Sequence, residues 1–154
     1  MMNKSIRKIL VPLIIAAAAL GYRTFIEPHL PEGAMASVDA EQSRVGIDQL
    51  MEAFKTRKSK LWLEVSGVVS KTLRDDTQGD QHQKFVLRLV NGHTVLVAHN
   101  FDLAPRVPLS KGDRVNIRGR YEWSKQGGVL HWTHRDPRNH IQGGWIQYEG
   151  KKYR

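Results

Sequence analysis

From Leu61 onward the sequence is a series of short β-type runs separated by turn residues, and this pattern most narrowly limits the fold. The runs are 61–73 (LWLEVSGVVSKTL), 84–90 (KFVLRLV), 93–99 (HTVLVAH), 113–123 (DRVNIRGRYEW) and 128–134 (GVLHWTH). Asn91-Gly92 and Gly127-Gly128 supply turn chemistry between them. In the fourth run apolar and mostly cationic residues alternate, as in a strand with one buried face. A mainly β domain with five strands is therefore predicted.

Two segments narrow this prediction to one architecture. VSGVV in the first run and PLSKGDRVNIRGRY leading into the fourth are typical of an OB-fold, a five-stranded Greek-key barrel. Lys111-Gly112-Asp113 supplies the turn into the fourth strand. A β-sandwich is the competing architecture, although it usually has more strands. We expect an OB-fold-like barrel over residues 59–154, with a C-terminal extension.

The N-terminal segment has the features of an export signal. Lys4, Arg7 and Lys8 precede an apolar run, Ile9 to Leu20, that is short for a membrane span. Residues 1–21 are expected to be a signal peptide or an N-terminal anchor, and to form the only contact with a membrane if they are not cleaved. The protein is accordingly expected to be exported, as a periplasmic or secreted protein or one anchored in the inner membrane.

One short amphipathic helix is predicted between this segment and the barrel. Residues 22–43 include EPHLPEGAMAS and are interpreted as a linker. Ile47, Leu50, Met51 and Phe54 then follow at helical spacing and predict a helix over 44–58 whose apolar face packs on the core.

Composition limits the chemistry and suggests a partner. The chain of 154 residues has no cysteine, which excludes disulfides, thiolate nucleophiles and thiolate metal ligands. The formal net charge is +9, and residues 59–154 hold sixteen basic and nine acidic residues. Such a domain attracts polyanions. A solvated basic surface without a partner is the alternative.

Histidines and aspartates gather where the barrel topology brings chain segments to one rim. The residues expected there are His82, His99, His131, His134, His140, Asp75, Asp76, Asp80, Asp102 and Asp136. Imidazoles and carboxylates can bind a divalent metal ion, activate water or move protons. The candidate catalytic residues are His99, His131, His134 and Asp136. The candidate metal ligands are His82, His99, His134, Asp136 and His140.

The alternative is that each histidine is structural. Residues 131 and 134 point to opposite faces of a continuous strand, so both reach one site only if Trp132-Thr133 forms a bulge.

A second candidate set is cationic and aromatic. Arginines and lysines on the outer barrel face are suited to phosphates, and tryptophans at the rim are suited to stacking on a base or sugar. This ligand-binding set is Lys84, Arg88, Arg114, Arg118, Arg120, Trp132 and Trp145. The alternative is that the tryptophans belong to the core and the charges keep the barrel soluble; Tyr121 and Trp123 are expected in the core.

Residues 66–153 contain the elements HQKF, VAHN, HWTHRDP and GGWIQYEGKKY. In these elements the chain resembles the Domain of Unknown Function 3465 family of small bacterial proteins. It implies a single exported or envelope-associated domain, and it supplies neither a reaction nor functional residues.

Three functions are compatible with these features. The favoured one is a module that binds a polyanion such as single-stranded nucleic acid. The second is a metal-dependent, nuclease-like phosphodiester hydrolase that uses the histidine and aspartate cluster. The third is an envelope module that binds another protein. The sequence leaves open whether the protein is an enzyme.

Overall fold

The computed structural model describes residues 32–154, so the predicted signal or anchor over 1–21 lies outside the described residues. By internal contacts the chain divides into Met1–Ala36 and Ser37–Arg154. All contacts given below lie within Ser37–Arg154. Among the described helices, none is long and apolar enough to cross a membrane.

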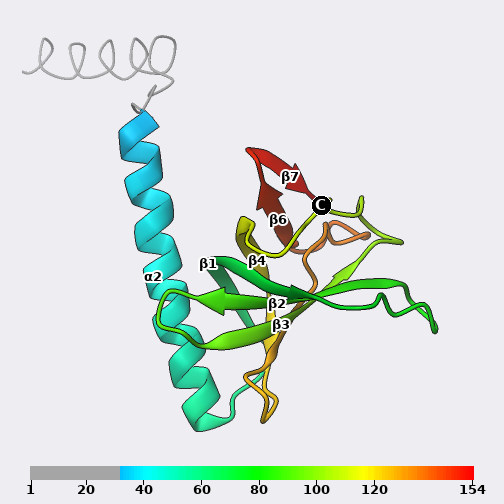
Figure 1. Ribbon diagram of the computed structural model, residues 1–154, viewed down its shortest axis with the longest axis horizontal. Helices are drawn as coiled ribbons and strands as arrows, with labels where there is room; N and C mark the ends of the chain where they lie inside the picture. The colour runs from blue at the N-terminus through cyan, green and yellow to red at the C-terminus, as the bar shows by residue number, and fades with distance from the viewer. Residues whose placement is uncertain (1–31) are drawn as a thin grey trace, which may run out of the picture. The chain divides into compact units, whose positions relative to one another are not determined.

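Five strands form a closed barrel (Figure 1). They are β1 (Leu61–Thr72), β2 (His82–Leu89), β3 (Thr94–Asn100), β4 (Arg114–Glu122) and β5 (Val129–His131). The order is β1-β2-β3-β5-β4, and pairing of β1 with β4 closes the ring. The β3–β5 pair is parallel and the other pairs are antiparallel. This is the OB-fold topology, so the predicted fold class is confirmed.

The C-terminal extension adds two short strands beside the barrel. They are β6 (Trp145–Tyr148) and β7 (Lys151–Tyr153). One edge of β4 is shared, because its last residues pair with β5 and its middle residues pair with β6. The chain that connects β5 to β6 carries the histidine-rich stretch and is therefore anchored to β4 at both ends.

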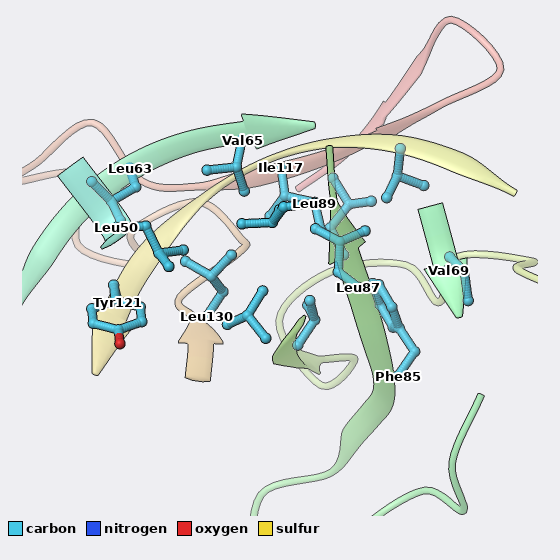
Figure 2. Packing of buried hydrophobic residues seen from close by; sticks show 14 of the residues in the cluster. Leu50, Leu63, Val65, Val69, Phe85, Leu87, Leu89, Ile117, Tyr121 and Leu130 are labelled. Atoms are coloured by element: carbon cyan, nitrogen blue, oxygen red, sulfur yellow. The ribbon is translucent and has the colours of Figure 1, made fainter. Parts of the chain in front are cut away.

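Alternating apolar side chains fill the barrel (Figure 2). In β4 the buried positions are every second residue, as the sequence pattern predicts. Phe85, Leu87, Ile117, Tyr121 and Leu130 are completely buried. Trp123 packs partly buried against this core. Placement of Tyr121 and Trp123 at the core is therefore confirmed.

The helix before the barrel is longer than the sequence pattern predicts. Helix α2 spans Glu32–Thr56 and so includes residues 32–43, which were expected to be linker; that prediction is wrong for these residues. Glutamate, alanine, methionine and glutamine in this stretch favour helix strongly enough to outweigh its glycine. The apolar stripe is confirmed, because Ile47 and Leu50 lie in the core and Met51 packs against it.

Helix α2 lies very close to the first strand. A Cβ added to Gly46 would come within 1.9 Å of the Glu64 backbone oxygen, so only glycine fits there. The Ser43 hydroxyl accepts a hydrogen bond of 2.8 Å from the Ser66 backbone N–H. The helix thereby covers one side of β1.

Candidate functional site

A cavity of about 470 Å³ opens at the rim of the barrel, and we call it the rim pocket. Its walls come from the β1–β2 loop, the end of β3 and the chain that follows β5. The lining residues are Asp80, His82, Asn100, Leu103, His131, Trp132, His134, Asp136, Pro137 and Arg138. Three of the predicted rim histidines, with two of the predicted aspartates, therefore line one pocket.

The backbone at Trp132 explains how two nearby histidines reach the same pocket. Strand β5 ends at His131, and Trp132 has a φ of 55°, which is left-handed backbone. The strand thus ends at this point and does not form the predicted bulge, and His131 and His134 both line the rim pocket. The Trp132 indole stacks on the His134 ring, with centroids 5.8 Å apart and planes at 23°.

Two imidazoles of the pocket are held in the same tautomer. His82 Nδ1 donates to the Asp80 backbone oxygen at 2.8 Å, and His134 Nδ1 donates to the Arg135 backbone oxygen at 2.7 Å. Because a carbonyl oxygen only accepts, each neutral ring carries its hydrogen on Nδ1 and a lone pair on Nε2. Neither Nε2 has a hydrogen-bond partner among residues 32–154.

The third imidazole lies beside an ion pair. His131 is opposite Arg120 in the β4–β5 register, and Arg120 Nε is 3.3 Å from Glu122 Oε1. The His131 Nε2 is 3.6 Å from the same carboxylate oxygen and is buried without a hydrogen bond. Burial lowers the pKa of His131, while the Glu122 carboxylate acts in the opposite direction.

His99 lies behind the pocket and is part of the fold. It is completely buried; its Nδ1 is 2.8 Å from Thr133 Oγ1 and its Nε2 is 3.1 Å from the Pro105 backbone oxygen. Both nitrogens are therefore occupied, and burial lowers the pKa of His99 below 6.5. His99 is therefore a structural histidine, which was the alternative for each histidine, and its position does not support the predicted roles as catalyst and metal ligand.

Asp136 and His140 form a turn. The two Asp136 carboxylate oxygens accept backbone N–H groups of Arg138, His140 and Ile141. Burial alone would raise the pKa of Asp136, but these N–H groups hold it below 3.8. The His140 side chain does not line the rim pocket.

The candidate metal ligands do not converge. Within the described part of the chain, no group of three or more histidine, aspartate or glutamate side chains is placed to hold a metal ion. Of the predicted set, three residues line the rim pocket without forming such a group (His82, His134 and Asp136), His99 is a buried structural histidine, and His140 lies outside the pocket lining.

Three pairs of a tryptophan and a cation lie on and beside the outer face of β4. Arg118 lies over Trp62 at 5.5 Å, Arg120 over Trp132 at 5.8 Å, and Lys152 over Trp145 at 4.2 Å, each measured to the ring centroid. We call these six residues the indole–cation surface. The strand register makes it continuous, because Trp62 pairs with Arg120 and Trp145 pairs with Arg118. All six residues come from neighbouring segments of the barrel and its extension.

Two glutamates hold the arginines of this surface in place. Arg118 Nη1 is 2.9 Å from Glu64 Oε1, and Arg118 Nε donates to the Gly143 backbone oxygen at 3.2 Å. Arg120 is paired with Glu122 in the same way. These pairs fix the guanidinium planes and offset part of their charge.

The remaining predicted phosphate ligands lie elsewhere on the barrel. Lys84 is on β2 and pairs with Asp76 at 3.7 Å. Arg88 and Arg114 occupy outward positions of β2 and β4, each opposite Val68 of β1. The structure thus brings Arg118, Arg120, Trp132 and Trp145 together and leaves Lys84, Arg88 and Arg114 outside the indole–cation surface.

Several residues of these sites were not selected from the sequence. Trp62 and Lys152 complete the indole–cation surface, while Asn100, Leu103 and Arg138 line the rim pocket. The alternation of β1 places Trp62 on the same face as Glu64, which was a usable signal. The others depend on pairing between distant segments.

The comparisons with known proteins agree with the resemblance noted from the sequence. The profile of a family described as "Protein of unknown function (DUF3465)" matches residues 35–154, which include the whole barrel and its extension. No curated protein matches the chain.

Proposed function

The chain belongs to the DUF3465 family, and we propose that it is a polyanion-binding module that holds single-stranded nucleic acid across the indole–cation surface. Small OB barrels bind oligonucleotides by combining cationic grooves with aromatic side chains on which bases stack. The net charge of +9 favours an anionic partner.

The observation that carries this proposal is the joint placement of three indoles and three cations on one face. Trp62, Trp132 and Trp145 are only partly buried, so part of each residue is accessible to a ligand. Each ring has a cation within 6 Å, so that a base and its neighbouring phosphate would meet matched groups. Tryptophans that merely fill a core need no such partners.

The ion pairs with glutamates still leave hydrogen-bond donors for phosphates. A guanidinium has five N–H donors, and Arg118 uses its Nε and one Nη1 bond within the protein. The other donors are available to a phosphate oxygen. Stacking on an indole also reduces the entropy that the arginine loses on binding.

The site differs from the face that OB-folds commonly use, which is centred on β2 and β3. The outward residues of β2 and β3 include His82, Lys84, Arg88, Thr94 and Leu96, with no tryptophan, tyrosine or phenylalanine among them. Stacking therefore favours the β4 face in this protein.

The test measures binding of the full-length protein to fluorescein-labelled single-stranded DNA of about twelve nucleotides by fluorescence anisotropy. Three phosphate contacts predict that affinity falls roughly twentyfold between about 50 and about 200 mM salt. Trp145→Ala should weaken binding at least about fivefold, because stacking contributes about 1–3 kcal/mol per base.

Arg88→Ala is the matched control, because it removes the same type of charge from the outer face of β2. It should weaken binding by less than about threefold, through the loss of one general charge. Binding that is absent, that does not depend on salt, or that is affected equally by Arg88→Ala and Arg120→Ala would contradict the proposal.

A further inference from the structure

We propose that the rim pocket cleaves a bound RNA strand by metal-independent acid–base chemistry in which His82 and His134 exchange protons with the substrate. This inference depends on the proposed function, since the indole–cation surface would hold the strand. The two regions are continuous, because Trp132 belongs to both.

The main observation behind this proposal is that two imidazoles in one pocket have Nδ1 in a hydrogen bond to a backbone oxygen, whereas Nε2 has no hydrogen-bond partner among residues 32–154. His82 Nδ1 is held by the Asp80 carbonyl and His134 Nδ1 by the Arg135 carbonyl. Such anchoring fixes the ring plane and the tautomer, as a general base requires. When an Nε2 is protonated, the same ring becomes a general acid.

The rest of the pocket fits an anionic ester. Trp132 packs on the His134 ring and restricts its motion. Arg138 supplies a positive charge for the phosphate, and Asn100 supplies a neutral polar group. The negative Asp136 is saturated by three backbone N–H groups. His131 has a buried nitrogen without a hydrogen bond, and such orphan groups often belong to functional sites.

The reaction needs no external reactant. One neutral imidazole takes the proton from a ribose 2′-hydroxyl, and the 2′-oxygen attacks the adjacent phosphorus. A new P–O2′ bond forms while the P–O5′ bond breaks, and the other imidazole, in its protonated form, gives its proton to the leaving 5′-oxygen. The products are a 2′,3′-cyclic phosphate and a free 5′-hydroxyl. DNA lacks the attacking hydroxyl and would be bound without cleavage.

The test incubates the full-length protein with 5′-labelled RNA and with DNA of the same sequence, in EDTA, and follows the products on a denaturing gel and by mass spectrometry. RNA should yield fragments that end in a 2′,3′-cyclic phosphate, and DNA should remain intact. His82→Ala and His134→Ala should each lower the cleavage rate about a hundredfold or more.

Two controls keep the result interpretable. His93→Ala removes a histidine whose Nε2 bonds the Gly127 backbone oxygen in another part of the barrel, and it should not change the rate. Because His134 is buried, its replacement could destabilise the fold, so the melting temperature of the His134→Ala protein is compared with that of wild type. His82 is only partly buried, so His82→Ala gives a second variant that disturbs packing less.

The outcomes separate this inference from the proposed function. Intact RNA together with salt-dependent DNA binding would overturn the inference and leave the binding function in place. Cleavage that persists in both variants, or cleavage of DNA, would also overturn it. Absence of both binding and cleavage would overturn both proposals.

Discussion

His99 Nδ1 and Thr133 Oγ1 lie 2.8 Å apart, and this hydrogen bond joins β3 to the turn that follows β5. The other ring nitrogen bonds the Pro105 carbonyl, so one buried imidazole connects three segments behind the rim pocket. Because the carbonyl accepts from Nε2–H, Nδ1 accepts from the Thr133 hydroxyl. The segment that carries His134, a lining residue of the rim pocket, is therefore held by a structural histidine.

Thr133→Val tests this connection. Valine keeps the shape of threonine but leaves the buried His99 Nδ1 without its donor, which costs about 1–3 kcal/mol. The free energy of unfolding, measured by urea denaturation, should fall by that amount. Thr94→Val is the control, because Thr94 is exposed on β3 and should change stability by less than about 0.5 kcal/mol. Equal effects of the two substitutions would contradict the role of the bond.

Stability should decrease as the pH falls below about 6.5. Burial lowers the pKa of His99, so below its usual value of 6.5 the unfolded chain binds a proton that the folded protein does not. The free energy of unfolding then decreases by about 1.4 kcal/mol for each unit by which the pKa is lowered. Burial of His131 acts in the same direction.

The measurement is the melting temperature between pH 8 and pH 5, for wild type and His99→Gln. The variant should be less stable at pH 8 but should lose less stability on acidification. An unchanged pH dependence in the variant would show that His99 does not titrate differently on unfolding.

Gln83 clamps the chain between β3 and β4. Its buried amide donates to the Val107 backbone oxygen at 2.7 Å and accepts from the Val107 N–H at 3.0 Å. Gln83→Met leaves the Val107 N–H unpaired, at a cost of about 1–3 kcal/mol, while the Val107 oxygen still accepts from the Leu109 N–H. Hydrogen exchange of the Val107 amide should become faster by at least tenfold, while the Val97 amide in β3 follows global stability alone. Unchanged protection of Val107 would refute the clamp.

Gly46→Ala should be destabilising although alanine favours helix. Alanine gains up to about 1 kcal/mol in helix propensity, whereas its Cβ would overlap the Glu64 backbone oxygen and push α2 away from β1. Overpacking of this kind costs about 1–3 kcal/mol, so the net effect is a loss. Val45→Ala changes the neighbouring exposed position and should alter the unfolding free energy by less than about 0.5 kcal/mol. A stabilised Gly46→Ala protein would contradict the close contact.

The fold was predictable because its signals are local. The alternation from Val115 to Trp123 and the Asn91-Gly92 turn can each be recognised within a short stretch of sequence, as can the glycines in the same stretches. The start of α2 was missed because residues 32–43 lack an apolar stripe, so helix propensity alone indicated them. Such propensity is a weaker signal than periodicity.

The candidate site was predicted only in part, because the role of each side chain depends on hydrogen bonds to segments that are distant in the sequence. Nothing near His99 in the sequence indicates that Pro105 and Thr133 occupy both its nitrogens. Asp136 had a local signal, since Asp-Pro commonly begins a turn in which the carboxylate accepts backbone N–H groups. The contact of Trp62 with Arg118, the diagonal neighbour of its register partner Arg120, depends on the β1–β4 register, which the sequence alone does not fix.

The most direct test of the binding surface is an NMR titration of the full-length protein with single-stranded DNA, followed at the four tryptophan indole N–H signals. Trp123 is an internal control, because its Nε1 donates to the Phe54 backbone oxygen and its ring pairs with Arg57, and neither of these residues belongs to the indole–cation surface. If nucleic acid binds on the indole–cation surface, the signals of Trp62, Trp132 and Trp145 shift while that of Trp123 stays. Shifts limited to Trp123, or no shifts at saturating DNA, would contradict a nucleic-acid site on the indole–cation surface.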